Sequence, residues 1–89
     1  MIGVYIRPAS MTPEQYESID EQVRATGVVP KGMKLHTCFG EGAGIAIFDV
    51  WESQEEFDAF AAVLGPIVEA SGLEPLAPMI VPMIAFETP

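Results

Sequence analysis

Four stretches of the chain carry the apolar pattern of β-strands. Residues 2–7, 33–39, 45–51 and 77–86 are rich in β-branched and aromatic side chains, which strands favour. The glycines between residues 40 and 44 suit a hairpin between the second and third stretches. Pro78 and Pro82 lie in the last stretch at positions whose missing N–H groups fall along one edge. The last strand is therefore predicted to pair on its other side only.

Two further stretches have the spacing of amphipathic helices. In the first, Thr12 is the expected N-cap, Pro13 the first helical residue and Gln15 the partner that closes a capping box. Gly27 supplies the left-handed residue that ends this helix. Its inward stripe is Tyr16, Ile19 and Val23, whereas Glu14, Glu17, Asp20 and Glu21 are expected to face water.

The second helix begins directly after the most apolar strand. Ser53 is its expected N-cap, and Glu56 follows at the position that completes a capping box. We expect Gly65-Pro66 to break or kink this helix, because proline cannot donate to the preceding turn. Apolar side chains recur at the spacing of a buried helical face, at Phe57, Phe60, Ala61 and Leu64.

The element order β-α-β-β-α-β predicts a single α+β domain over residues 1–89. The expected fold class is ferredoxin-like, a four-stranded antiparallel sheet with two helices on one face. Within it, we expect the first and third strands to lie side by side and parallel, so that Arg7 and Trp51 share one end of the sheet. The second strand then brings Lys34 and His36 toward the same end.

The hairpin register predicts which side chains share a face of the sheet. One register gives an apolar face, which we expect to receive the helices; it carries Leu35, Thr37, Phe39, Ala46, Phe48 and Val50, together with Val4 and Ile6. The opposite face then carries Tyr5, Arg7, Lys34, His36, Cys38, Asp49 and Trp51 among Ile45 and Ile47. In this arrangement Lys34 is placed opposite Asp49.

Composition suggests a second copy of the chain as a partner. The 89 residues are 49% hydrophobic with a mean hydropathy of +0.31, a high content for a chain whose isolated core would be marginal. Apolar surface buried in a homodimer accounts for this excess. No apolar run reaches the roughly 18 residues that a membrane span needs, and the amino-terminal stretch lacks the features of a signal peptide.

Charge and cysteine content exclude several classes of function. The net charge is −9, from 13 acidic and 4 basic residues, which disfavours nucleic acid and anionic membranes as partners. Cys38 is the single cysteine and His36 the single histidine, so neither an internal disulfide nor a metal site is predicted. Nothing in the sequence requires a cofactor. A cytoplasmic location fits these features.

The stretch Asp49-Val50-Trp51-Glu52-Ser53, followed by Phe57 and Phe60, resembles the dimeric α/β-barrel superfamily. The resemblance spans nearly the whole chain and includes Arg7. It implies two sheets paired face to face across a two-fold axis, and a superfamily that holds antibiotic-biosynthesis-monooxygenase-like proteins, haem-degrading enzymes, isomerases and cyclases. The motif marks the fold and does not specify an activity.

The resemblance also argues against one branch of that superfamily. Haem-degrading members carry an Asn late in the first strand, a Trp in the second helix and a His about three turns later. The corresponding positions here are Ile6, Phe60 and Ala70. Because none of the three residues is retained, haem degradation is not expected.

His36 and Arg7 are the candidate catalytic residues. His36 is the natural general base or ligand anchor, because no other side chain here titrates near neutral pH without a large shift. The alternative is a half-buried strand histidine bonded to a neighbour. Arg7 could hold a carboxylate or a phenolate, or it could pair with Asp49 or with a partner chain.

Further candidates line a ligand site: Tyr5, Trp51, Asp49, Phe57 and Phe60. Packing is the alternative for Trp51, and Tyr5 is balanced between packing and a hydrogen bond to a ligand. Cys38 is expected to be a core thiol.

Three functions remain open at this point. The first is a homodimeric module that binds a small hydrophobic or aromatic molecule in a cavity between helices and sheet. The second is a cofactor-independent enzyme of the monooxygenase, isomerase or cyclase type, with His36 as general base and Arg7 as anion anchor. For that enzyme we expect the substrate on the barrel-facing side of the sheet, because the helix-facing cavity is expected to offer no polar group. The third is a structural or assembly role.

Overall fold

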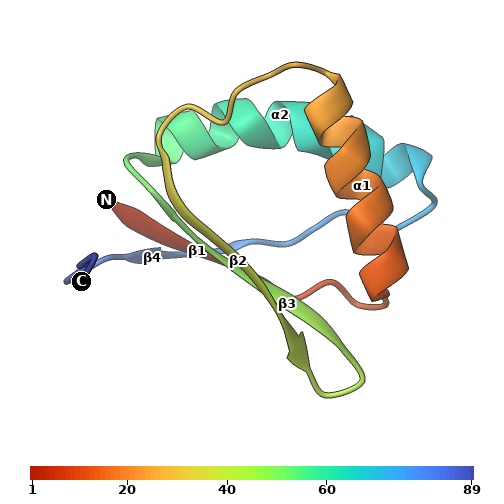
Figure 1. Cartoon of the computed structure of the whole chain (residues 1–89), viewed down its shortest axis with the longest axis horizontal. Coiled ribbons are helices and arrows are strands. Elements are labelled where there is room, and N and C mark those ends of the chain that lie inside the picture. The colour runs from red at the N-terminus through yellow and green to blue at the C-terminus, as the bar shows by residue number, and fades with distance from the viewer.

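Two helices cover one face of a four-stranded sheet (Figure 1). The computed structural model describes the whole chain, residues 1–89. Its elements follow in the order β1 (Ile2–Ile6), α1 (Pro13–Ala25), β2 (Met33–Glu41), β3 (Gly44–Trp51), α2 (Gln54–Ala70) and β4 (Met79–Pro82). The strands lie in the order β2-β3-β1-β4, and all three pairings are antiparallel. The predicted α+β ferredoxin-like fold is confirmed.

The first and third strands do not run parallel, so that part of the prediction is wrong. β1 pairs antiparallel with β3, with Ile2 opposite Trp51 and Ile6 opposite Ile47. The reason is topological: β3 follows β2 through a tight hairpin, and it therefore runs against both β2 and β1. Arg7 and Trp51 consequently lie at opposite ends of the sheet.

The helices also cover the opposite face of the sheet from the one predicted. The predicted grouping of hairpin side chains on the two faces is correct, since Leu35 pairs with Val50 and Thr37 with Phe48. Antiparallel pairing, however, puts Val4 opposite Asp49 and therefore on the face that carries His36. The helix-facing side holds Val4, Ile6, Ile45, Ile47 and Trp51, which form the core with residues of α1 and α2. By alternation, the open side holds Tyr5, Leu35, Phe39, Phe48 and Met79.

Gly3 of β1 is required because two side chains approach its backbone closely on the open face. A Cβ atom at Gly3 would lie 2.8 Å from the ring of Phe48 and 2.9 Å from the sulfur of Met83. The bare backbone of β1 at this point lets both side chains lie across it.

The helix boundaries follow the predicted caps. Thr12 and Gln15 form the reciprocal capping box of α1. Ser53 accepts a hydrogen bond from the backbone N–H of Glu56 at the start of α2, but the predicted second capping box is incomplete, because the Glu56 side chain accepts from the Ser53 hydroxyl and not from its backbone N–H. Of the two alternatives at Gly65-Pro66, a break or a kink, the break is wrong, because α2 continues through Pro66 to Ala70. The turn that follows Pro66 brings Val68 into the core, where its side chain is 2% exposed. This burial compensates for the hydrogen bond that proline cannot make.

The last strand is shorter than predicted but has the predicted edge position. β4 covers residues 79–82 and pairs with β1 alone. Pro78 and Pro82 bound it, as expected where a strand needs no partner on one side. No helix in the protein has the length and hydropathy needed to cross a bilayer.

Candidate functional site

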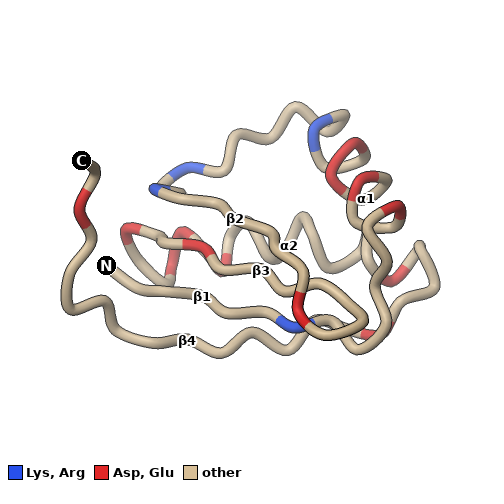
Figure 2. The backbone as a smooth tube through the Cα atoms, turned by 60° about the horizontal axis from the view of Figure 1, so that its bottom comes forward, with Lys and Arg blue, Asp and Glu red and all other residues tan.

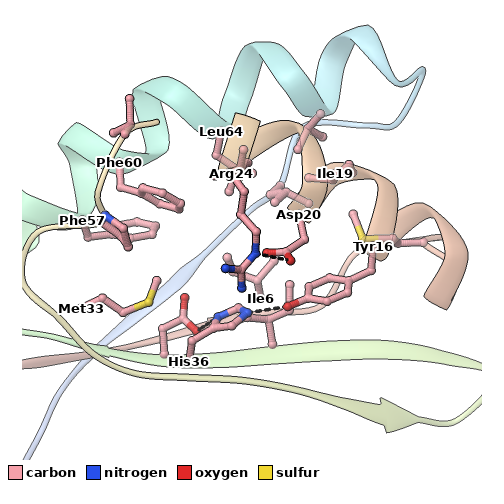
Figure 3. Close-up of a pocket in the computed structure, with 18 residues that line it drawn as sticks. Ile6, Tyr16, Ile19, Asp20, Arg24, Met33, His36, Phe57, Phe60 and Leu64 are labelled. Atoms are coloured by element: carbon pink, nitrogen blue, oxygen red, sulfur yellow. Dashed lines mark hydrogen bonds and ion pairs between the residues drawn. The ribbon is translucent and has the colours of Figure 1, made fainter. Parts of the chain in front are cut away.

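A cavity of about 250 Å³ lies between the helices and the sheet (Figure 3). Thirteen of its 18 lining residues are hydrophobic. They come from both helices, from the sheet and from the loop before β2, and include Ile6, Ile19, Val23, Met33, Phe57, Phe60 and Leu64. A largely apolar wall of this kind favours an apolar occupant.

Three side chains form a hydrogen-bonded row along one wall of this cavity, and we call them the polar row. Antiparallel pairing places His36 of β2 opposite Asp49 of β3, and the imidazole Nδ1 lies 2.7 Å from Asp49 Oδ1. Tyr16 of α1 reaches the other ring nitrogen, with its hydroxyl 2.5 Å from Nε2. All three residues line the cavity. The expectation that this cavity offers no polar group is therefore wrong.

The hydrogen-bond pattern sets the donor and acceptor roles within the row. A carboxylate only accepts, so Nδ1 carries the proton that is donated to Asp49. In neutral His36, Nε2 is then an acceptor, and the Tyr16 hydroxyl donates to it. When His36 is protonated, Nε2–H donates to the phenolic oxygen instead. The row stays connected in both protonation states of His36.

Electrostatics keep the phenol neutral and favour the imidazolium. The hydrogen bond to Asp49 raises the pKa of His36 above its usual value, against the opposing effect of burial. Burial raises the pKa of Tyr16 to about 12, and nearby acidic groups act in the same direction. Asp49 is 5% exposed, so its partner His36 compensates for a desolvated carboxylate.

An ion pair on α1 borders the same cavity. Arg24 Nε donates to Asp20 Oδ2 at 2.9 Å, and both residues line the cavity. Asp20 was expected to face water with the other acidic residues of this helix, but it is only partly exposed. The geometry follows from the four-residue spacing, which puts the two side chains on one helical face.

The predicted site residues separate into two groups. His36, Asp49, Phe57 and Phe60 come together around the cavity. Trp51 lies next to it, fully buried and packed against Phe57 and Phe60 at ring-centroid distances of 5.7 and 5.5 Å. Its indole Nε1 is buried without a hydrogen-bond partner.

Arg7 and Tyr5 do not join the cavity, and the expected pairing of Arg7 with Asp49 is wrong. Both side chains meet Glu41 instead: the Tyr5 hydroxyl donates to Glu41 Oε2 at 2.5 Å, and Arg7 Nε lies 3.6 Å from the same oxygen. The antiparallel register explains the separation, because Tyr5 pairs with Phe48 and so turns away from the helices. Arg7 therefore cannot hold an anion beside His36.

Two smaller expectations also fail. Lys34 is not opposite Asp49, because the register that pairs Leu35 with Val50 places His36 there; Lys34 pairs with Glu52 at 3.3 Å. Cys38 is exposed rather than a core thiol, since β2 is an edge strand of the sheet.

Sequence reasoning missed Tyr16, Asp20 and Arg24 as site residues. One signal pointed to Tyr16: it lies in the inward stripe of α1, and a buried tyrosine hydroxyl needs a hydrogen-bond partner. No group of three or more His, Cys, Asp or Glu side chains is arranged to hold a metal ion.

Three solved structures share this fold. NE2512, a protein of unknown function from Nitrosomonas europaea, matches over 99% of this chain and 93% of its own, with a TM-score of 0.67 and 15% identity. SnoaB, a cofactor-independent oxygenase from Streptomyces nogalater solved as a mutant, matches over 96% and 93%, with a TM-score of 0.64 and 18% identity. Rv0793 from Mycobacterium tuberculosis matches over 98% and 96%, with a TM-score of 0.63 and 11% identity.

No protein-family model matches the chain, and neither does any curated protein. At identities between 11% and 18%, the structural likeness shows the fold. It is consistent with the resemblance to small dimeric α/β-barrel proteins that the Asp49–Ser53 motif indicates.

Proposed function

We propose that this protein binds a small hydrophobic or aromatic molecule in the cavity between the helices and the sheet. The observation that supports the proposal is the combination of a largely apolar wall with the polar row of Tyr16, His36 and Asp49. Ligand sites have this composition, with few polar groups that fix the orientation of an apolar body. The volume of about 250 Å³ suits a molecule of one or two rings.

The polar row orients a hydroxyl group of such a molecule. When the Tyr16 hydroxyl donates to His36, the phenolic oxygen still has a free acceptor site. A ligand O–H can donate to that oxygen and extend the row by one hydrogen bond. Because the pKa of Tyr16 is about 12, the phenol remains a neutral partner at physiological pH.

Calorimetry with 2-naphthol tests the proposal. Val23→Phe adds a ring to a half-buried residue of α1 that lines the cavity, and we expect it to abolish binding of 2-naphthol. Ala59→Phe is the matched control, because this exposed position on α2 does not line the cavity. Circular dichroism checks that both variants fold. Absence of binding to the wild-type protein, or equal binding to Val23→Phe, would reject the cavity as the site.

A cofactor-independent enzyme is the second candidate function, and the His36–Asp49 pair favours it. Neutral His36 can take a proton from an acidic carbon or hydroxyl of the bound molecule, through Tyr16 or directly. The resulting imidazolium is stabilised by Asp49, the partner that already raises its pKa. SnoaB, which has the same fold at 18% identity, is a cofactor-independent oxygenase.

Proton exchange provides an assay that needs no identified substrate. We expect wild-type protein to accelerate hydrogen–deuterium exchange at the acidic carbon of 2-tetralone in deuterated water, as followed by NMR. His36→Gln should lose this acceleration, because glutamine cannot take the proton. If 2-tetralone binds without faster exchange, the protein acts as a binding module towards this probe and the enzymatic candidate loses its support.

We also propose that two chains pair through the open face of the sheet. This face exposes Leu35, Phe39 and Met79 by 37%, 44% and 62%. The accessible surface of the chain is 5785 Å², compared with about 5,100 Å² for an ordinary monomer of this mass. Pairing open faces would cover apolar side chains that the helices do not reach and leave the cavity on the outer side of each sheet.

A further inference from the structure

We infer that the ligand of this cavity carries a carboxylate, which Arg24 binds at the mouth. The ligand class is then a small aromatic or apolar carboxylic acid. This inference rests on the proposed function, because it concerns the same cavity. It assigns a role to Arg24, a residue outside the apolar stripe of α1 that the sequence pattern did not select.

Arg24 is positioned as one wall of the cavity. It lies in the last turn of α1 and lines the same space as Tyr16 and His36. Figure 3 shows its guanidinium group extending from the helix towards the sheet, above the imidazole ring of His36. The side chain is 78% exposed, which places the charge where the cavity opens to solvent.

Only one edge of the guanidinium group is in use. Arg24 Nε donates to Asp20 Oδ2 at 2.9 Å, and its two terminal amino groups make no hydrogen bond in the structure. Those amino groups form a second edge with donors spaced to match the two oxygens of a carboxylate. Asp20 is therefore a positioning residue: it fixes the guanidinium by one edge and leaves the other available to a ligand.

Arg24 is the only lysine or arginine at this site, and the other basic residue of the cavity, His36, is paired with Asp49. Figure 2 shows one basic position at the end of α1, well apart from the other Lys and Arg residues, while several acidic residues lie along α1. Arg7, Lys31 and Lys34 do not line the cavity. Asp49, the second carboxylate of the cavity, is already bound to His36. Because the charge of His36 is offset by Asp49, Arg24 is the cation with donors left for an anion that enters.

A cationic ligand is the competing possibility, with Asp20 as its partner. An amine would have to displace the guanidinium from Asp20 to gain an equivalent contact. A carboxylate joins the unused edge and leaves the existing ion pair intact. This difference favours the acid over the amine.

Calorimetry with three probes that share one ring system tests the inference: 2-naphthoate, 2-naphthamide and 2-naphthylmethylamine. The amide matches the carboxylate in shape and lacks its charge. We expect wild-type protein to bind 2-naphthoate about three- to tenfold more tightly than 2-naphthamide, the range for a charge-assisted contact that is partly exposed. Arg24→Gln should remove this advantage, because it weakens binding of 2-naphthoate far more than binding of the uncharged 2-naphthamide.

Asp20→Asn is the matched second variant. It keeps an oxygen acceptor for Arg24 Nε and removes a negative charge beside the anion. We therefore expect 2-naphthoate to bind more tightly to Asp20→Asn than to wild type, with 2-naphthamide unchanged. A variant that merely damaged the helix would weaken both probes.

The outcomes separate this inference from the proposed function. Equal binding of 2-naphthoate and 2-naphthamide, an advantage that survives in Arg24→Gln, or tighter binding of 2-naphthylmethylamine would overturn the carboxylate ligand and leave the cavity as a binding site. If no probe binds to any of the proteins, the carboxylate ligand and the binding function both fail.

Discussion

Asp49 determines the protonation behaviour of the only histidine in the chain. Its carboxylate is buried on the helix-facing side of β3 and lies 2.7 Å from His36 Nδ1. Burial alone would lower the pKa of His36, yet the hydrogen bond and charge of Asp49 raise it. At the scale of single residues, the centre of the site is therefore the His36–Asp49 pair in a largely apolar wall.

Removal of the Asp49 charge should reverse the direction of this shift. In Asp49→Asn we expect the pKa of His36 to fall below its ordinary value of about 6.5, because burial then dominates. NMR titration of the ring protons is unambiguous, since His36 is the single histidine. Asp20→Asn is the control and should lower the pKa less, because Asp20 contributes only a weaker electrostatic effect. A wild-type pKa below 6.5 would contradict the described geometry.

At the scale of elements, the polar row connects α1 to the sheet. Tyr16 lies on α1, His36 on β2 and Asp49 on β3, so one chain of hydrogen bonds joins three elements across the cavity. Asp20 and Arg24 of α1 also act on His36, the first raising and the second lowering its pKa. The charge of His36 is thereby coupled to the folded arrangement of α1 on the sheet.

This coupling predicts a pH-dependent contribution to stability. Folding raises the pKa of His36, so its contribution is fully present below the unfolded pKa and is lost as the pH rises through the folded pKa. We expect the free energy of unfolding of wild type to exceed that of His36→Gln by more at about pH 5.5 than at about pH 8.5. Urea denaturation at both pH values measures this difference, and the subtraction removes the titration of other carboxyl groups. A difference that is constant, or larger at high pH, would contradict it.

The two aromatic residues of α2 should differ in their contributions to stability. Both line the cavity, but Phe57 is 5% exposed in the core beside Trp51, whereas Phe60 is only partly buried. Truncation of a buried aromatic side chain costs about 3–5 kcal/mol, and we expect Phe57→Ala to lie in this range. Phe60→Ala should cost less, because part of its ring faces empty space. Urea denaturation at one protein concentration compares the two, and equal losses would show that Phe60 is as fully packed as Phe57.

The elements were predictable from sequence because their signals are local. The Thr12–Gln15 capping box, the Ser53 N-cap and the flanking prolines of β4 each act within a few residues. The face of the sheet that receives the helices was predicted wrongly, because the first and third strands were expected to run parallel. Both faces of the hairpin are largely apolar, so only the antiparallel register of β1, which places Val4 opposite Asp49, distinguishes them.

The candidate site was predictable in part for the same reason. His36, Asp49, Phe57 and Phe60 were selected by residue type, and the structure brings them together. Arg7 was assigned to the site because the first and third strands were expected to run parallel. The observed antiparallel pairing places it outside the site. Tyr16 and Arg24 reach the site across a helix–sheet packing distance that no local pattern encodes.

At the scale of the whole molecule, the isolated chain buries few of its residues. Only 13 of its 89 residues are buried. Two small clusters hold five and four of them, one near Trp51 and one around Met11 and Val68. A core of this size gives limited stability to an isolated chain. The open face of the sheet has the largest supply of apolar side chains left to bury.

The last prediction concerns the association of two chains through that face. Light scattering at micromolar concentration should give twice the chain mass of 9.6 kDa. Leu35→Glu combined with Phe39→Glu places two charges on the open face, and burial of unpaired charges is costly; we expect this variant to be a monomer with reduced stability. Val29→Glu is the control, because Val29 is 78% exposed in the loop before β2 and lies away from the open face, and it should keep the wild-type mass. A stable wild-type monomer, or a dimer that survives both open-face substitutions, would show that the apolar face remains solvated or that the chains associate through another surface.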